Sequence, residues 1–128
     1  RLNAFHHARE EIVAFALADR GATIIATPAA FSVSTGEAHW HVLMRARATE
    51  TACHVLAAAQ NGSHADGRET FGHSIAVEPW GAVLADAGTG ISDKGYTLNL
   101  APVDPNAGVR ARQAIPLARS RANRNISL

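Results

Sequence analysis

The stretch AAFSVSTGEAHWHVLMRARATE, from Ala29 to Glu50, predicts a loop followed by a helix. Ser34 and Glu37 match a capping box, in which each side chain bonds to a backbone N–H at the start of a helix. The helix is therefore expected to span Thr35–Glu50. The segment also carries histidines, a tryptophan and several charged side chains, a mixture typical of an active site. The apolar stripe of the helix is expected to comprise Val42, Leu43 and Ala46.

Regular elements are predicted on both sides of this helix. Apolar residues recur with a helical period from His7 to Arg20, and Gly21 then matches a glycine that ends a helix. The run ATIIAT (Ala22–Thr27) predicts a strand buried on both faces, and CHVLAAA (Cys53–Ala59) predicts a second buried strand. This order of helices and strands indicates an α/β chain.

The second half of the chain predicts shorter elements. Gln60–Thr70 is polar and glycine-rich, as in a long loop. The runs GHSIAVE and AVLADA flank the turn sequence PWG (79–81), which predicts a β-hairpin. Tyr96–Leu100 predicts another strand. Asp104 and Pro105 are suited to the N-cap and first position of a last short helix.

The composition bounds the class of protein. The chain has 128 residues, 47% of them hydrophobic, which is enough for one domain with a core. Its formal charge of +1 argues against nucleic acid or an acidic membrane surface as a partner. With one cysteine and no long apolar run, we expect a cytoplasmic protein with no membrane partner. The local excess of positive charge, expected to be solvated, comprises Arg110, Arg112, Arg119, Arg121 and Arg124.

The residues alone offer no group suited to breaking a C–N bond. That reaction requires a nucleophile, a base and donors that stabilise the oxyanion. Cys53 opens a predicted buried strand, where an apolar environment disfavours the reactive thiolate, so we expect a structural role for it. The only lysine, Lys94, lies in a polar turn and is expected to be exposed.

The seven histidines do not predict a metal site. None is paired with another at the i, i+4 spacing of a helical zinc motif, and His39 and His41 point in different directions on a helix. We therefore expect no metal ion and no other cofactor. His73, after the polar loop, is the histidine most suited to a pocket or to a supporting position beside one. Arg47 and Glu50 are spaced to contact each other across one helical turn.

Several short motifs occur in one order along the chain: PAAF, TGEAHW, LMRARATE, AAAQNG, GRETFGHS, PWGAVLA and RQAIP. Together they resemble the carbon–nitrogen hydrolase (nitrilase) superfamily, in particular its amidase branch related to deaminated-glutathione amidase and ω-amidase. The resemblance extends from Arg9 to Arg121. Each motif is short, but the ordered set is specific.

The resemblance implies an αββα four-layer sandwich that forms homodimers, and a Glu–Lys–Cys catalytic triad. Residues 1–128 correspond to a partial domain, the C-terminal half of this fold. The family's nucleophilic cysteine falls near Phe5, and the Glu and Lys positions precede it, so no catalytic residue is expected in this chain. Cys53 matches a family position that is not catalytic.

The resemblance also implies roles for residues around the quoted stretch. The loop before the helix borders the substrate pocket, and the helix contributes to a subunit interface. Candidate pocket-wall residues are Ala30, Phe31, Thr35, His39 and Trp40, to which the sequence pattern adds His73. Candidate interface residues are Arg20, Arg45, Arg47 and Glu50.

The expected function is that of part of an amidase. The complete enzyme would hydrolyse a linear amide to a carboxylate and ammonia, and this chain would be inactive alone. A small-molecule amide is then a partner only when the N-terminal half is supplied. Two alternatives stay open: a non-catalytic dimerisation or binding module, and one half of a split amidase.

Overall fold

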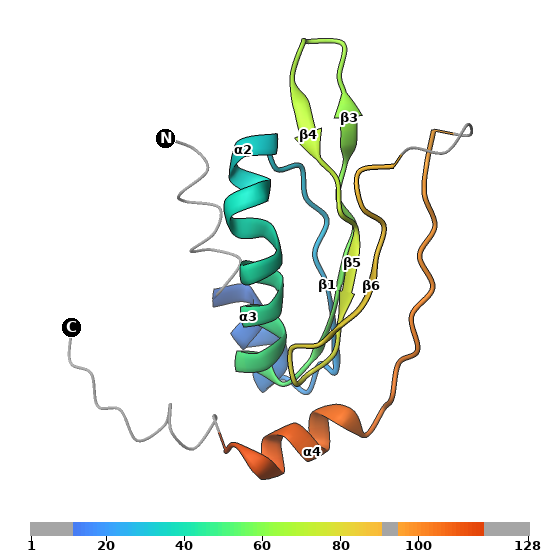
Figure 1. Cartoon of the computed structure of the whole chain (residues 1–128). Coiled ribbons are helices and arrows are strands. Elements are labelled where there is room, and N and C mark those ends of the chain that lie inside the picture. Colours follow the sequence, from blue (N-terminus) through green and yellow to red (C-terminus); the bar gives the residue numbers. More distant parts are fainter. Residues whose placement is uncertain (1–11, 91–94, 117–128) are drawn as a thin grey trace, which may run out of the picture.

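The computed structural model describes residues 12–90 and 95–116. Residues 12–19 are helical, and a four-stranded sheet follows with the order β1-β2-β5-β6. Figure 1 shows α3 lying along one face of this sheet, the β3–β4 hairpin projecting beyond one end, and α4 beside the other end. The elements are β1 (Ile24–Ala26), α2 (Val33–Thr35), a π-helix (Gly36–Trp40), α3 (His41–Thr51), β2 (His54–Ala57), β3 (Asn61–Ser63), β4 (Glu69–Phe71), β5 (Ile75–Val77), β6 (Val83–Asp86) and α4 (Ala107–Ala114).

The helix of the quoted stretch forms as predicted, but its start differs. Ser32 is the N-cap and accepts a hydrogen bond from the Thr35 N–H, so the predicted capping box of Ser34 and Glu37 is wrong. The helix then widens into the π-helical turn before α3 begins. A Cβ on Gly36 would lie 2.3 Å from the Phe71 side chain, so this turn needs glycine to approach β4.

The buried stripe of the helix also differs from the predicted one. Trp40, Met44 and Ala48 face the core at i, i+4 spacing, whereas Val42 is 67% exposed. Trp40 sets this rotation, because its Nε1–H donates a 2.7 Å hydrogen bond to the His73 carbonyl and its ring is fully buried. Leu43 packs only at the margin of the core.

One face of the sheet carries the core. Ile25, Val55 and Val77 are in register across β1, β2 and β5, and all three are buried. β1 pairs parallel to β2, and the other pairs are antiparallel. Val55 and Val77 pack with α3, and Ile25 packs with Ala14 of the first helix. These contacts form one helical layer on one sheet.

The opposite face of the sheet is partly open. Ile24 is 44% exposed and Leu56 is 37% exposed, although both belong to strands predicted to be buried. The prediction of a β1 strand buried on both faces is therefore wrong for the described part of the chain. A buried residue, His54, interrupts this open surface.

The polar stretch Gln60–Thr70, predicted as a loop, contains a hairpin. β3 pairs antiparallel with β4, with Gly62 opposite Thr70, and Gly67 turns the chain with a positive φ of 79°. β3 has no buried residue and reads Asn-Gly-Ser, so it lacks the apolar alternation by which a strand is recognised, whereas Thr70 and Phe71 of β4 are buried. The hairpin predicted around 79–81 is confirmed as β5–β6.

The C-terminal elements need two corrections. Residues 96–100 form no strand, and Leu98 and Leu100 are exposed, because this segment does not enter the sheet. α4 begins at Ala107, later than predicted, because the Asp104 carboxylate accepts from the Asn106 N–H in the turn before the helix.

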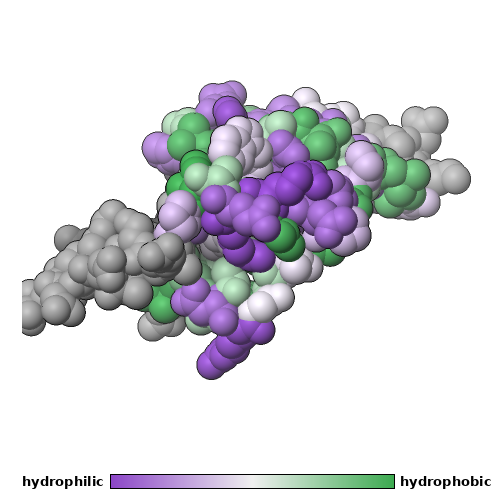
Figure 2. Space-filling view, turned by 90° about the horizontal axis from the view of Figure 1, so that it is seen from below, coloured by the Kyte–Doolittle hydropathy of each residue, from purple (hydrophilic) through white to green (hydrophobic). Residues whose placement is uncertain are grey.

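α4 closes one end of the sheet. Gly108 lies so close to α3 that a Cβ would be 2.6 Å from the Ala52 carbonyl oxygen, and Arg112 reaches the Ala22 and Thr51 carbonyls. Figure 2 views this end of the molecule, where hydrophilic and hydrophobic residues are interspersed over the visible surface. Within residues 12–90 and 95–116, no helix is long and apolar enough to cross a membrane.

Candidate functional site

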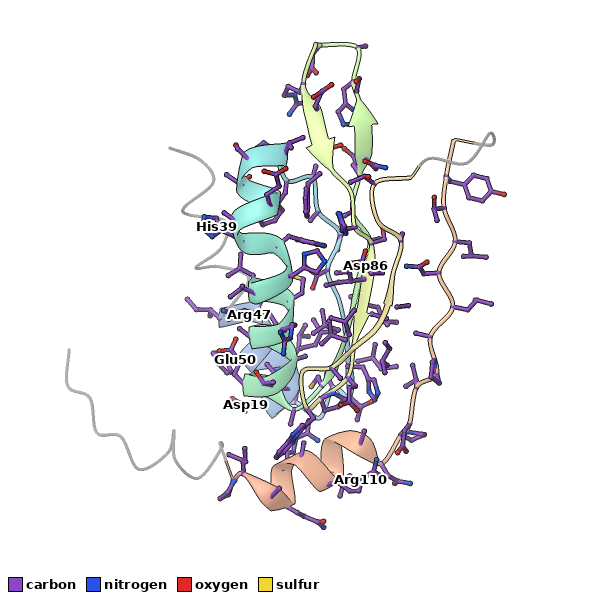
Figure 3. The ribbon with its side chains drawn as sticks, in the orientation of Figure 1. Asp19, His39, Arg47, Glu50, Asp86 and Arg110 are labelled. Atoms are coloured by element: carbon purple, nitrogen blue, oxygen red, sulfur yellow. The ribbon has the colours of Figure 1, made fainter. Side chains whose placement is uncertain are left out.

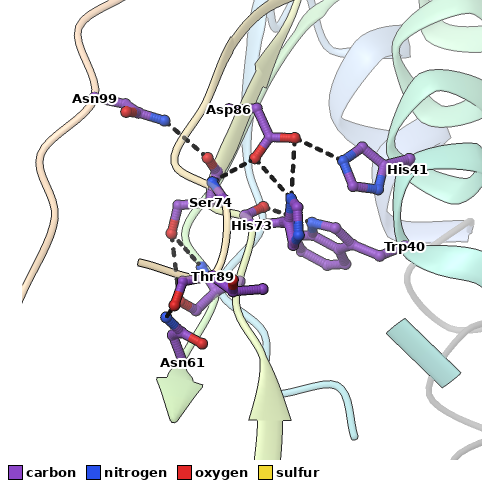
Figure 4. Close-up of polar contacts among 10 residues, drawn as sticks. Trp40, His41, Asn61, His73, Ser74, Asp86, Thr89 and Asn99 are labelled. Carbon is purple, nitrogen blue, oxygen red and sulfur yellow. Dashed lines mark hydrogen bonds and ion pairs between the residues drawn. The ribbon is translucent and has the colours of Figure 1, made fainter. Parts of the chain in front are cut away.

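Two histidines and an aspartate from three elements meet at the edge of the sheet (Figure 4). His41 is the first residue of α3, His73 links β4 to β5, and Asp86 ends β6. The Nε2 atom of His41 lies 2.8 Å from Oδ2 of Asp86, and the Nδ1 atom of His73 lies 2.9 Å from Oδ1. These three residues are called the His–Asp–His cluster below.

The backbone around His73 holds its ring in place. His73 has a φ of 57°, a left-handed conformation that few non-glycine residues adopt. Its N–H donates to the Gly88 carbonyl at 2.9 Å, and its own carbonyl accepts from the buried Trp40 indole. The Phe71 ring stacks on the imidazole, with centroids 4.4 Å apart. The imidazole is therefore fixed from three directions. The left-handed backbone of His73 is unfavourable, and such strained residues are commonly found at functional sites.

The pKa of Asp86 is shifted by opposing effects. Burial raises the pKa, but hydrogen bonds from His41, the Gly88 N–H and His73 outweigh it, so the pKa lies below the ordinary value of 3.8. Asp86 is thus a carboxylate at neutral pH. It accepts from both imidazoles and links α3 to the β5–β6 hairpin.

A cavity of about 310 Å³ lies beside His73, at the end of the sheet where β2 ends and β5 begins. Ser74 on its wall donates from Oγ to the Ala59 carbonyl, and Asn61 donates from Nδ2 to the Thr89 carbonyl. The side chains on this wall are amide, hydroxyl, imidazole and phenol groups, which suit a polar small molecule. The lining includes Gln60, Asn61, His64, His73, Ser74 and Tyr96.

The structure brings three of the six candidate pocket-wall residues together. Phe31 and Trp40 have ring centroids 5.1 Å apart, and Trp40 bonds to His73, which is the member of the six that lines the cavity. Ala30 and His39 are exposed. Figure 3 shows His39 pointing away from the sheet that carries Asp86.

Thr35, the remaining pocket-wall candidate, is occupied within its own turn. Its Oγ1 lies 2.7 Å from the Oγ of Ser32 and donates to the Ser32 carbonyl. The assignment of all six residues to a substrate pocket stays a prediction.

The interface candidates occupy different environments. Arg47 and Glu50 form the predicted contact, with a distance of 2.6 Å between Nη1 and Oε1, and Figure 3 shows them together on α3. Arg45 donates from Nε to the Gly81 carbonyl in the β5–β6 turn, and Arg20 is exposed after the first helix. Their role between subunits stays a prediction.

The expectation that Cys53 is buried is confirmed. Its side chain is fully buried, and its Sγ lies 3.1 Å from the Ala22 carbonyl, to which it donates. Phe5, which matches the family's nucleophile position, and Lys94 lie outside the described residues.

Sequence reasoning missed several polar residues of this region. Gln60 and Asn61 lie in the AAAQNG motif and begin the predicted polar loop, but no individual role is predicted for either. No local pattern brings His41 and Asp86 together, because 45 positions separate them. Their proximity depends on the pairing of β5 with β6 and the rotation of α3. Among the residues that line the cavity, only His73, in the GRETFGHS motif, is individually predicted to lie in or beside a pocket.

One helical layer on one mixed sheet, with a polar cavity at the end of its strands, is the arrangement of two adjacent layers of an αββα sandwich. The profile of the family described as carbon-nitrogen hydrolase matches residues 8–113. The chain therefore belongs to the carbon–nitrogen hydrolase family, and it has the mixed α/β fold of the nitrilase superfamily.

Individual relatives agree with this assignment. Human deaminated glutathione amidase is 45% identical over 109 residues, which are 85% of this chain and 32% of the human protein. The crystal structure of Saccharomyces cerevisiae Nit3, a member of branch 10 of the nitrilase superfamily, is 31% identical with a TM-score of 0.72, and 87% of this chain and 39% of that chain are covered. The Caenorhabditis elegans NitFhit structure is 33% identical with a TM-score of 0.71, covering 90% and 26%. The chain thus spans about a third of the curated relatives it matches.

Proposed function

We propose that this chain forms the C-terminal part of an amidase that hydrolyses a linear amide to a carboxylate and ammonia. The observation that carries the proposal is the 45% identity to human deaminated glutathione amidase within a matched family profile. The polar cavity beside His73 supports it, because amide and hydroxyl groups suit an amide substrate. Deaminated glutathione is the first compound to assay.

The chain is proposed to be inactive alone. Amide hydrolysis through a covalent intermediate needs a thiolate that the substrate reaches. Cys53 is the single cysteine, and it is fully buried with its thiol directed at backbone carbonyls. The nucleophile, its base and its lysine would come from the part of the sandwich that precedes the matched region.

The open face of the sheet also supports the proposal that a preceding part of the sandwich completes the enzyme. Ile24 and Leu56 expose apolar surface on strands of the central sheet, where the second sheet of an αββα sandwich packs. We propose that the N-terminal half covers this face. Dimerisation through the first helix and α3 is proposed separately, with Arg20, Arg45, Arg47 and Glu50 at the contact.

The test is ammonia release from deaminated glutathione and from short linear amides. The chain is assayed alone, and then joined as one polypeptide to the N-terminal two-thirds of human deaminated glutathione amidase. We expect no release by the chain alone and release by the joined protein. Cys53→Ala is the matched control and should leave the activity of the joined protein largely unchanged.

Two results contradict the proposal. Release by the chain alone that is lost in Cys53→Ala would make Cys53 a nucleophile. A folded joined protein that is inactive on every amide, beside an active human enzyme, would remove the amidase assignment.

A split amidase is the second candidate, because a separate chain could cover the open sheet face as well as a joined N-terminal half could. Mixing this chain with the unlinked N-terminal part distinguishes the two arrangements. Activity on mixing at micromolar concentrations supports two chains, whereas activity restricted to the joined protein supports one.

A further inference from the structure

We propose that His41, His73 and Asp86 form a binding site for a borderline divalent transition-metal ion such as Zn²⁺ or Co²⁺. The ligand atoms of these three residues, two imidazole nitrogens and a carboxylate oxygen, all lie within 4.8 Å of one another. Two histidines and one carboxylate form a donor set used by zinc and by non-haem iron proteins, with further positions open to water. The proposal does not depend on the proposed amidase function.

The distances are close to those of a metal site, and the histidine nitrogens and the carboxylate oxygens would move slightly apart to admit the ion. Each histidine nitrogen lies 2.8–2.9 Å from an Asp86 oxygen. Ligand atoms around a tetrahedral zinc ion, at bond lengths of about 2.0–2.2 Å, lie about 3.4 Å apart. Small rotations of the side chains therefore suffice to place the ion between them. The exposures of the His41, His73 and Asp86 side chains, 34%, 23% and 30%, leave room for entry and for a bound water.

The surroundings keep the ligands in place before a metal ion binds. Stacking on Phe71 and the hydrogen bond from Trp40 to the His73 carbonyl fix the His73 ring. The Gly88 N–H donates to Asp86 at 2.8 Å, which orients the carboxylate. Support of this kind raises the affinity of metal sites, because fewer side-chain rotamers are lost on binding.

The site was not predictable from spacing, because its ligands come from three separate elements. His41 is on α3, whereas His73 and Asp86 are held together by the β5–β6 hairpin. The expectation of no metal ion rests on the absence of helical i, i+4 histidine pairs, and the His–Asp–His cluster does not use such a pair. A bound ion would join α3 to the hairpin and stabilise that contact.

The experiment is calorimetric titration of the 128-residue chain with Zn²⁺, and with Co²⁺ followed by visible absorption. The substitutions His6→Gln and His7→Gln are introduced into the chain used for the titration, because they remove an adjacent pair of histidines that could bind the ion instead. We expect one ion per chain, Co²⁺ absorption bands typical of four or five ligands, and no binding of Mg²⁺ or Ca²⁺, which prefer all-oxygen sites.

Variants assign the site. Asp86→Asn and His41→Gln should each weaken Zn²⁺ binding by at least about tenfold, and His39→Gln, on the exposed side of the same helix, should leave it unchanged. Circular dichroism checks that each variant is folded. NMR of the parent chain provides an assignment without variants, because Zn²⁺ should shift the ring nitrogens of His41 and His73 but not those of His39.

Three results overturn the proposal. They are the absence of stoichiometric binding, equal binding by Asp86→Asn and the parent chain, and NMR shifts confined to other histidines.

Discussion

The two faces of the four-stranded sheet differ sharply although they are built from the same strands. On one face Ile25 is 5% exposed and Val55 is fully buried under the helices. On the other face their neighbours Ile24 and Leu56 are 44% and 37% exposed. Apolar residues follow one another along β1 and β2, a pattern typical of strands buried on both faces. The described part of the chain covers only one of these faces.

This difference indicates that the chain supplies a packed core on one face of the sheet and needs a further layer on the other. The covered face holds a packed core with Trp40 and Met44 from the helix. The open face has aliphatic side chains in contact with water, which is unfavourable by about 25 cal/mol for each Å² of apolar surface left exposed. Another layer is therefore expected to add stability by covering it.

The largest effect is expected from adjacent isoleucines on β1. Ile25→Ala should lower the free energy of unfolding by about 2–5 kcal/mol, because it leaves a cavity in the core. Ile24→Ala removes the same atoms from the open face and should cost less than about 1 kcal/mol. Urea melts of both variants measure the difference. Equal costs would mean that the two faces are not distinct.

A smaller effect is expected where the helix meets the β3–β4 hairpin on the covered side. Gly36→Ala places a Cβ 2.3 Å from the Phe71 side chain and should destabilise the chain by about 1–3 kcal/mol. Gly90→Ala is the matched control, because nothing lies within 4 Å of its Cβ position. Thermal melts should separate the two variants, and coincident melts would contradict this packing.

The smallest effect concerns the pH dependence of stability at Asp86, which links α3 to the β5–β6 hairpin. The pKa of Asp86 is lowered in the fold, so its stabilising contribution is complete above the unfolded value of 3.8 and is lost as pH falls through the lower folded value. The stability difference between the parent chain and Asp86→Asn should therefore shrink below about pH 4. Melts from pH 7 to pH 3 measure this stability difference. A difference that grows below about pH 4 would contradict the lowered pKa of Asp86.

The sequence predicted much of the fold but less of the site. The α/β order, the 79–81 hairpin, the buried Cys53 and the contact between Arg47 and Glu50 follow from local patterns and short spacings, and all four are confirmed. The rotation of α3 and the meeting of His41 with Asp86 were not predicted. They depend on one long-range hydrogen bond of Trp40 and on strand register, which periodicity does not encode.

The central proposal is that the Leu56 face, which is open in the described part of the chain, is covered by the N-terminal half of the amidase proposed above. The direct measurement is maleimide labelling of Leu56→Cys, with the native Cys53 as internal reference. In the folded chain we expect rapid labelling at position 56 and labelling of Cys53 only after denaturant is added. Position 56 should become protected when the N-terminal two-thirds of human deaminated glutathione amidase is joined to the chain. Slow labelling at position 56 in the chain alone, or equally rapid labelling in the joined protein, would contradict the account.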